Sequence, residues 1–172
     1  MSDESAAQWY AVHAKPRSEE LAEAHLQRQG FRIYLPRIRF SKRRRGRWTQ
    51  VTEPLFPRYL FVYVDPNTEG IAPIRSTRGV TGLVRFGDVP MPVPDDAIEA
   101  IRAMEDPEEG VYIPGRAQLQ KGEKVRVVEG AFAGLQGIYQ AESGEERAII
   151  LIDILGRQSR VRIETNGLEK AT

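Results

Sequence analysis

The sequence of 172 residues contains no cysteine and only two histidines, His13 and His25. The lack of cysteine excludes disulfide bonds and thiolate metal sites, and two histidines are too few for a convincing zinc site. The N-terminus, Met-Ser-Asp-Glu-Ser, is acidic and lacks an apolar run, so it does not resemble a secretion signal. No stretch approaches the length of a membrane span. We therefore expect a soluble cytoplasmic protein that carries no metal or other cofactor.

Patterns of residues that would predict catalysis are also missing. Ser143, the two histidines and the scattered acidic residues show no pairing of a nucleophile with a base. The sequence has no Gly-Lys-Ser/Thr loop of the kind that cradles phosphates. We therefore interpret the chain as a binding protein and not as an enzyme.

The net charge of +1 is distributed unevenly along the chain. Residues 1–104 hold 16 Lys and Arg against 12 Asp and Glu, whereas residues 105–172 hold 9 against 12. Halves of opposite charge indicate two modules with different partners, which could also attract each other. We expect an N-terminal domain at residues 6–104, an acidic linker at 105–118 and a C-terminal domain at 119–172.

The N-terminal half begins with patterns typical of a strand and then a helix. Residues 8–14 are expected to form the strand. Residues 19–29 follow at helical spacing, with Ser18 as the N-cap and Gly30 just beyond the end of the helix. Residues 31–35 alternate as a second strand.

The end of this half predicts another strand and helix. We expect a loop at residues 65–73 and a strand at residues 80–86, followed by a segment in which Pro90, Pro92 and Pro94 exclude regular structure. Asp96 and Glu99 then form a capping pair for a second helix. The apolar stripe of that helix consists of Ile98, Ile101 and Met104.

A basic segment lies between these elements. From Arg32 to Arg47 there are eight basic residues and no acidic residue, and two alternating arms around Gly46 predict a β-hairpin. A charge run is usually a solvated loop. Four consecutive cations nevertheless repel each other, and a nearby phosphate backbone would relieve that repulsion. We therefore predict nucleic-acid contact here. The candidate residues are Arg43, Arg44, Arg45 and Arg47.

The most informative strand runs from Tyr59 to Val64. Its aromatic residues point to one face of a sheet and its aliphatic residues to the other. The two sets are Tyr59, Phe61 and Tyr63 against Leu60, Val62 and Val64. Pro54 and Pro57 cannot donate to a ladder, so regular pairing is expected only after Pro57. A buried central strand explains the pattern. So does an aromatic platform that stacks RNA bases or docks a protein helix.

The C-terminal half predicts a small β-barrel of short strands separated by glycines. The expected strands are Lys121 to Val128, Leu135 to Ala141, Arg147 to Leu155 and Arg160 to Ile163. The strand that begins at Arg147 has an alternative. Ser143 and Glu146 form a capping box and Gly156 could end a helix, so a helix and a strand both fit this segment.

Three stretches carry a resemblance to a known family. The sequence Glu-Pro-Leu-Phe-Pro-Arg-Tyr-Leu-Phe-Val, which begins at Glu53, and Thr77-Arg78-Gly79-Val80 resemble the N-terminal domain of the NusG family of transcription elongation factors. Glu129-Gly130-Ala131-Phe132-Ala133-Gly134 resembles the C-terminal KOW domain of that family. Within the family, Glu-Pro-Leu-Phe-Pro, Glu-Gly-Ala-Phe and a further motif, Val84-Arg85-Phe86-Gly87, make the chain more similar to the RfaH subgroup.

The resemblance implies an α+β fold, in which an antiparallel sheet flanked by helices precedes a small KOW β-barrel. It implies a monomeric elongation and antitermination factor that binds RNA polymerase and suppresses pausing or termination. Its partners would be the clamp helices of the largest polymerase subunit, the non-template DNA strand, and a small-subunit ribosomal protein or a termination factor at the KOW domain. A general NusG-type factor and an RNA- or ribosome-binding protein are the alternatives.

The resemblance also assigns residues to these partners. The polymerase-binding residues are Leu55, Phe56, Tyr59 and Phe61, the DNA-binding residues are Lys15, His25, Thr77 and Arg78, and the KOW partner-binding residues are Phe132 and Leu151. Competing interpretations are a surface ion pair for Arg78 and a helix-face histidine packed on the sheet for His25. One segment and one single residue differ from the sequence pattern of the RfaH subgroup. Gly70-Ile71-Ala72-Pro73 replaces a loop that touches the polymerase, and Leu21 replaces an arginine that contacts DNA.

The RfaH subgroup finally implies a conformational switch. Its C-terminal module can fold as a helical hairpin that masks the aromatic face, and it refolds as a barrel after release. Glu53 and Arg147 correspond to a salt-bridged pair that helps to hold the closed state. The residues expected to cover Tyr59 and Phe61 are Leu135, Tyr139, Ile149 and Ile150. Gly137 makes the first helix of such a hairpin less favourable.

Overall fold

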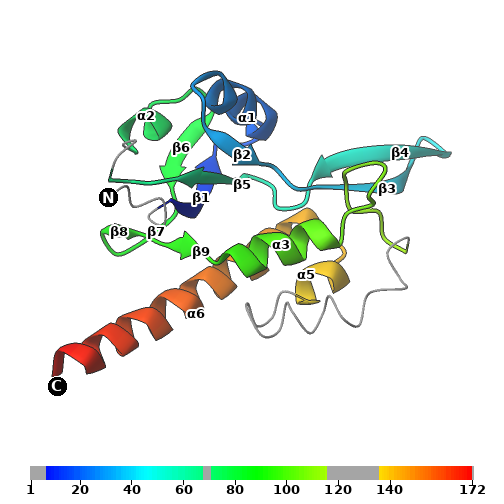
Figure 1. Ribbon diagram of the computed structural model, residues 1–172. Helices are drawn as coiled ribbons and strands as arrows, with labels where there is room; N and C mark the ends of the chain where they lie inside the picture. The colour runs from blue at the N-terminus through cyan, green and yellow to red at the C-terminus, as the bar shows by residue number, and fades with distance from the viewer. Residues whose placement is uncertain (1–6, 68–70, 116–135, 172) are drawn as a thin grey trace.

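A five-stranded antiparallel β-sheet organises the computed structural model, which describes residues 7–67, 71–115 and 136–171 (Figure 1). The strand order is β2-β5-β1-β6, and β9 also pairs with β1. The strands are β1 (Gln8–Ala14), β2 (Arg32–Tyr34), β5 (Tyr59–Val64), β6 (Val80–Leu83) and β9 (Pro92–Val93). The predicted start of pairing after Pro57 is confirmed for β5, which pairs with β1 from Tyr59 opposite His13 to Val64 opposite Gln8. Pro54, however, is already paired with Arg37 in the basic hairpin.

The alternation of side chains in β5 produces two separate hydrophobic clusters. The aliphatic residues of β5 pack under α1 (Glu19–Arg28) and α2 (Ala72–Arg75), which contribute Ala22, Leu26 and Ile74. The aromatic residues belong to a second cluster on the other face, together with α3 (Asp95–Ala103). The predicted stripe of α3 is buried there. Helices therefore cover the sheet on both faces, as expected for the α+β class.

Two arginines, one from α3 and one from β2, pack on aromatic rings of the sheet. The guanidinium of Arg102 on α3 lies 4.6 Å from the ring centre of Tyr34 and 5.4 Å from that of Trp9. Arg32 on β2 lies 5.3 Å from Trp9 and 5.1 Å from Tyr63. Such contacts contribute about 0.5–1 kcal/mol each at exposed sites.

The basic segment forms the predicted hairpin, a ribbon of β3 (Arg37–Arg44) and β4 (Arg47–Pro54) that projects from the sheet (Figure 1). The segment after α3 fixes its base. The amide of Arg39 donates to the carbonyl of Tyr112 (2.9 Å), and the amide of Tyr112 donates to the carbonyl of Arg37 (2.9 Å). A second, smaller hairpin of β7 (Arg85–Phe86) and β8 (Val89–Pro90) lies at the opposite end of the structure.

The C-terminal part is helical, in α5 (Gln136–Gln140) and α6 (Gly144–Ala171). The strands expected from residue 135 onward are therefore wrong for this conformation, and the helical alternative is the one adopted. The amide of Glu146 donates to Ser143 Oγ (3.1 Å), which confirms the predicted N-cap. Gly156 does not end α6, because a glycine costs a helix only about 1 kcal/mol. The expected strand at Lys121 to Val128 lies outside the described residues.

Other local predictions also need correction. Ser18 is the N-cap of α1 as expected, but its side chain makes no capping hydrogen bond. Asp96 makes none either, and Pro94 is the N-cap of α3. Pro90 and Pro92 belong to two-residue strands, which is possible because so short a ladder at a sheet edge does not need a proline amide. The strand expected at residues 80–86 is interrupted at Val84. The short helix α2 begins at Ala72, inside the loop expected at residues 65–73.

Across residues 7–67, 71–115 and 136–171, no helix has both the length and the apolar character needed to cross a membrane.

Candidate functional site

The candidate polymerase-binding residues lie on the aromatic face of the sheet and in the turn before β5. Leu55, Phe56 and Phe61 are completely buried. Phe56 and Phe61 meet edge to face with ring centres 6.2 Å apart. Tyr59 is only half-buried and stacks on His13 of β1 with ring centres 5.0 Å apart. The four residues therefore form one continuous apolar surface, with Tyr59 at its margin.

The C-terminal helices cover this surface. Four of their side chains are fully buried in the same cluster as Phe56 and Phe61. They are Ile138 of α5 and Leu151, Ile154 and Leu155 of α6. Positions 151, 154 and 155 follow the three- and four-residue spacing of one helix face. Figure 1 shows α6 running beneath the sheet beside α3. The cover thus replaces water over the whole central part of the aromatic face.

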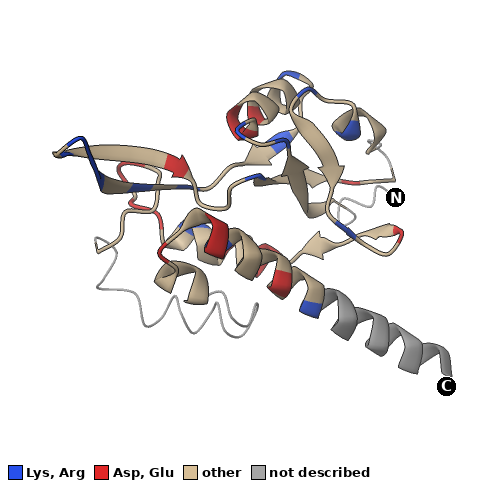
Figure 2. Ribbon diagram, turned by 180° about the vertical axis from the view of Figure 1, so that it is seen from behind, with Lys and Arg blue, Asp and Glu red and all other residues tan. Residues whose placement is uncertain are grey.

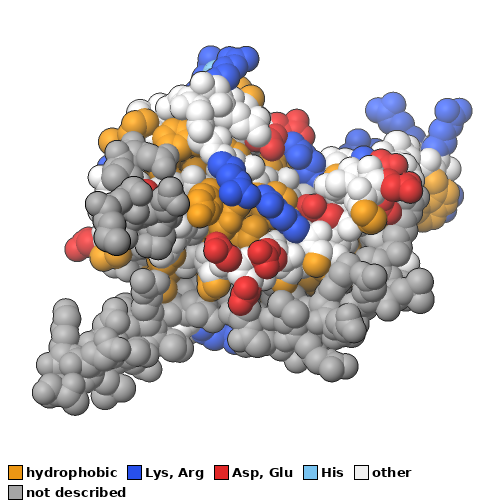
Figure 3. Space-filling model, in the orientation of Figure 1, with side chains coloured by type: hydrophobic (Ala, Val, Ile, Leu, Met, Phe, Trp, Pro, Cys, Tyr) orange, Lys and Arg blue, Asp and Glu red, His pale blue; other side chains and the backbone are white. Residues whose placement is uncertain are grey.

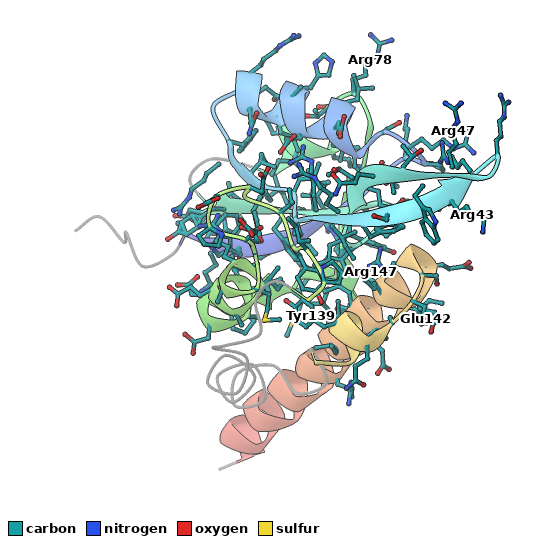
Figure 4. All side chains as sticks on the ribbon, turned by 90° about the vertical axis from the view of Figure 1, so that its right-hand side faces the viewer. Arg43, Arg47, Arg78, Tyr139, Glu142 and Arg147 are labelled. Carbon is teal, nitrogen blue, oxygen red and sulfur yellow. The ribbon has the colours of Figure 1, made fainter. Side chains whose placement is uncertain are left out.

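A buried arginine joins α6 to the turn before β5. Arg147 is only 2% exposed, and its Nε donates to the carbonyl oxygen of Leu55 (2.7 Å). Its Nη2 lies 3.6 Å from Oε1 of Glu53, which is a charge contact longer than a hydrogen bond. Burial lowers the pKa of Arg147, and the nearby carboxylate of Glu53 opposes that shift. The predicted pair is therefore brought together, and Figure 4 shows Arg147 directed from α6 into the N-terminal part.

Tyrosines line the other end of the cover. The ring of Tyr139 on α5 packs against that of Tyr112, with centres 5.0 Å apart. The hydroxyl of Tyr34 donates to Glu105 (2.5 Å). Burial raises the pKa of Tyr34 and of Tyr139 well above the usual range, and Glu105 adds to both shifts. Burial also raises the pKa of Glu105. Burial at this end of the cover therefore disfavours the charged forms of all three groups.

A cleft of about 1000 Å³ opens where the first turns of α6 meet the N-terminal part. Tyr59, Pro57 and Ile149 line it, with Arg58 and Glu19 at the side of α1. The buried carboxylate of Glu19 accepts a hydrogen bond from the amide of Arg58 (2.8 Å). Burial, and then the charge of Arg58, lower the pKa of His13, which stacks on Tyr59. The margin of the aromatic face is therefore open to solvent while its centre is covered.

The predicted covering residues occupy different positions. Tyr139 and Ile150 pack against the cluster, whereas Ile149 is 63% exposed and lines the cleft. Leu151, predicted as a partner-binding residue of the KOW domain, is fully buried in this conformation. Leu135 and Phe132 lie outside the described residues. The residues of α6 that are buried could have been predicted from their spacing on one helical face: Arg147, Leu151, Ile154 and Leu155.

The candidate DNA-binding residues fall into two groups. Lys15 and Arg78 are exposed near the start of α1, His25 is half-buried on that helix, and Arg78 points away from the C-terminal helices (Figure 4). Thr77 is buried, and its hydroxyl donates to the carbonyl of Pro73 (2.7 Å) and accepts from Gln29 (2.7 Å). In this conformation Thr77 therefore holds the turn before β6.

The second group consists of the four arginines of the ribbon, which are all exposed. Figure 2 shows cations along the ribbon and acidic residues at intervals on α6. Glu109 neutralises one arginine at the base, because its carboxylate lies 2.8 Å from Nη1 of Arg39. The excess positive charge is therefore concentrated toward the tip.

The part of the chain that the structure describes holds no group of His, Cys, Asp and Glu residues able to bind a metal ion. Of the loop that departs from the subgroup, Ile71 precedes α2, Ala72 and Pro73 begin it, and Gly70 lies outside the described residues.

Comparison with known proteins identifies the family. A family model described as "Transcription termination factor nusG" matches residues 7–102. The transcription termination/antitermination protein NusG of Staphylococcus carnosus is 29% identical over 185 residues, which cover 99% of this chain and all of that protein. The protein of the same name from Staphylococcus aureus is 28% identical with the same coverage. A solved structure described as "Domain interaction in Thermotoga maritima NusG" is 29% identical, covers 56% of this chain and 54% of that one, and has a TM-score of 0.38. Because the family model spans more than half of the residues, the chain belongs to the NusG family of transcription termination and antitermination factors, which are not enzymes.

Proposed function

We propose that this protein is an elongation and antitermination factor of the RfaH type, which rests in a closed form and binds RNA polymerase only after release. The observation that carries the proposal is that its own C-terminal helices bury three of the four candidate polymerase-binding residues, Leu55, Phe56 and Phe61. A partner helix and the C-terminal cover would compete for one apolar surface.

The proposed domain division is a polymerase-binding domain at residues 6–104, a linker at 105–118 and a KOW-type domain at 119–172. After release, the last domain would refold as a β-barrel and use Phe132 and Leu151 to recruit the ribosome or a termination factor. Leu151 is fully buried in the closed form, so it could bind a partner only after such a rearrangement. The β-branched run of α6 is suited to a strand once the sheet no longer covers it.

The open form would hold polymerase on its DNA. Lys15, Arg78 and the ribbon arginines are exposed in the closed form already, so they would contact the non-template strand without a further rearrangement. By bridging the polymerase clamp and the DNA, the N-terminal domain would disfavour pausing and termination.

Capture of purified RNA polymerase by the full-length chain tests the proposal. Arg147→Ala leaves the carbonyl of Leu55 without this donor and Glu53 without its counter-ion, a loss of about 1–3 kcal/mol to the closed form. We expect this variant to capture more polymerase than the wild type. Arg157→Ala is the matched control, because Arg157 lies on the same helix and forms an exposed pair with Asp153 (3.1 Å).

A second substitution connects the gain to the aromatic face. Tyr59→Ala in the Arg147→Ala background should remove the gain, because burial of such a ring contributes about 1.5–3 kcal/mol. Val89→Ala, at an exposed apolar residue of β8, should leave the gain unchanged. Equal capture by the wild type and Arg147→Ala would instead favour a general NusG-type factor that needs no release.

A further inference from the structure

The tip of the β3–β4 ribbon carries a tryptophan that its own fold does not use. Trp48 is 70% exposed, and every residue from 41 to 50 is exposed as well. In the register of the ribbon, Trp48 pairs with Arg43, and the next pair on that face is Ser41 with Gln50. The indole therefore has no apolar neighbour across the ribbon or next to it on its own face. The apolar pair of the ribbon, Phe40 with Val51, lies on the other face.

Cations lie on both faces of the ribbon tip. Arg43 lies beside it, and Arg44 and Arg47 form the pair that closes the ribbon on the other face. The side chains at the end of the ribbon are conspicuously basic in the space-filling view (Figure 3), and Figure 4 shows Arg43 and Arg47 on its outer part. Arg45 forms the turn with a positive φ of 51°, and Gly46 follows with a φ of 76°. The tip thus combines a flat aromatic ring with charges of one sign.

These two features select different parts of a nucleic acid. Arginines bind phosphates on paired and unpaired strands alike. An indole stacks only on a base whose face is uncovered, and inside a duplex the neighbouring base pairs cover both faces. Both requirements are met together where a duplex ends and an unpaired strand begins.

We propose that the ribbon tip is a binding site for the boundary between duplex and unpaired DNA, with the arginines on phosphates and Trp48 stacked on the exposed base face. This inference rests on the DNA contact proposed above and specifies it. DNA fits better than RNA, because the major groove of B-form DNA, about 12 Å wide, admits a two-stranded β-ribbon. The major groove of A-form RNA is deep and narrow.

Tryptophan fluorescence of the full-length chain provides the test. The chain has two tryptophans, and Trp9 is buried, so solvent-sensitive emission comes mainly from Trp48. The probes are a DNA fork with two unpaired arms, a relaxed circular DNA duplex without ends, and an RNA fork of the same sequence. We expect strong quenching by the DNA fork and weak quenching by the circle and the RNA fork. Equal quenching by the circle would overturn the stacking, and equal quenching by the RNA fork would overturn the choice of DNA.

Substitutions then separate stacking from charge. Trp48→Leu keeps apolar bulk but loses the ring, and we expect about tenfold weaker binding of the DNA fork with an unchanged salt dependence. Trp48→Phe should restore most of the affinity. Arg43→Gln with Arg47→Gln should instead weaken binding of both DNAs and lower the slope of log affinity against log salt by about two. Arg85→Gln, on the hairpin at the other end of the structure, is the charge control.

The outcomes separate base stacking by Trp48 from the DNA contact of the ribbon. Wild-type affinity of Trp48→Leu for the fork, together with weakened binding by the double arginine variant, would overturn the stacking and leave the ribbon's DNA contact intact. Wild-type affinity of the double arginine variant would overturn the DNA contact of the ribbon itself. Because all of these side chains are exposed, the substitutions should leave the melting temperature unchanged, and circular dichroism checks this.

Discussion

Two glycines of α6 provide a matched test of the closed form. Alanine at Gly144 or at Gly156 lowers the intrinsic cost of the helix by up to about 1 kcal/mol. Their surroundings differ, however. A Cβ at Gly144 would lie 2.6 Å from Cγ and 3.1 Å from Cδ of Pro57, whereas a Cβ at Gly156 would meet nothing nearer than 3.4 Å, an atom of the Phe86 ring. We therefore predict that Gly144→Ala opens the protein and Gly156→Ala closes it further.

The magnitudes follow from these distances. A separation of 2.6 Å is shorter than real carbon–carbon contacts, and the ring of Pro57 is part of the turn that leads into β5, so it cannot rotate away. Overpacking of this kind costs about 1–3 kcal/mol. After subtraction of the helix gain, Gly144→Ala should destabilise the closed form by up to about 2 kcal/mol and raise the open fraction up to about 30-fold. Gly156→Ala should lower that fraction about fivefold.

Hydrogen–deuterium exchange of the full-length chain measures the effect independently of any partner. Peptides that cover residues 147–155 should exchange faster in Gly144→Ala and more slowly in Gly156→Ala, while peptides from β1 and β5 stay protected. Polymerase capture should change in the same order. If both variants slow the exchange of α6, helix propensity outweighs the contact with Pro57, and the packing proposed for the closed form is wrong.

Three further predictions concern other contacts. Tyr139→Phe should leave stability unchanged or raise it slightly, because its buried hydroxyl has no hydrogen-bond partner among the described residues; thermal melting checks this. Glu105→Gln should stabilise the protein at neutral pH. The raised pKa of Glu105 means that the folded chain binds its proton more tightly, so wild-type stability falls as pH rises from about 4.5 through that pKa. Urea unfolding from pH 4 to 8 should show a gain for the variant that disappears at the acid end, and a constant gain would contradict this reasoning. Gly79→Ala should cost about 1–3 kcal/mol, because Gly79 has a φ of 88° and its Cβ would lie 3.1 Å from the amide of Ala22; chemical denaturation measures the loss.

The sheet could be predicted from local patterns because its strands are bounded by clear signals. Pro57 marks the start of β5, and the aromatic and aliphatic residues of β5 alternate without a break. The positive φ of Gly30 confirms the expected residue after α1. The basic hairpin was predictable for the same reason, since two alternating arms enclose Gly46. In each case, residues that are neighbours in the sequence are enough to predict where the element begins or ends.

The C-terminal half could not be predicted from its own residues. The run from Arg147 to Leu155 has β-branched residues that favour a strand and a capping box that favours a helix. The buried cluster that α6 shares with Phe56 and Phe61, about 90 residues earlier in the chain, provides the packing that the helix requires. Because that packing is long-range, local periodicity could indicate both structures but could not choose between them.

The assignment of individual side chains was weaker than the assignment of elements. Ile149 was expected under the sheet, yet α6 is rotated so that Leu151 and Leu155 lie there instead. A helix rotates its side chains by about 100° per residue, so a difference of one or two positions moves a residue from the core to solvent. The buried hydroxyl of Thr77 shows the same limit, because its partner Gln29 is distant in sequence.

The cover of the aromatic face belongs to the same polypeptide as the face itself, and this has a kinetic consequence. A tethered segment acts as a competitor at a local concentration of about millimolar, whatever the dilution of the protein. An outside ligand at micromolar concentration cannot outcompete it by mass action alone unless its affinity is much higher. Association with such a ligand should therefore become first order at high ligand concentration, with a plateau rate equal to the rate at which α6 departs.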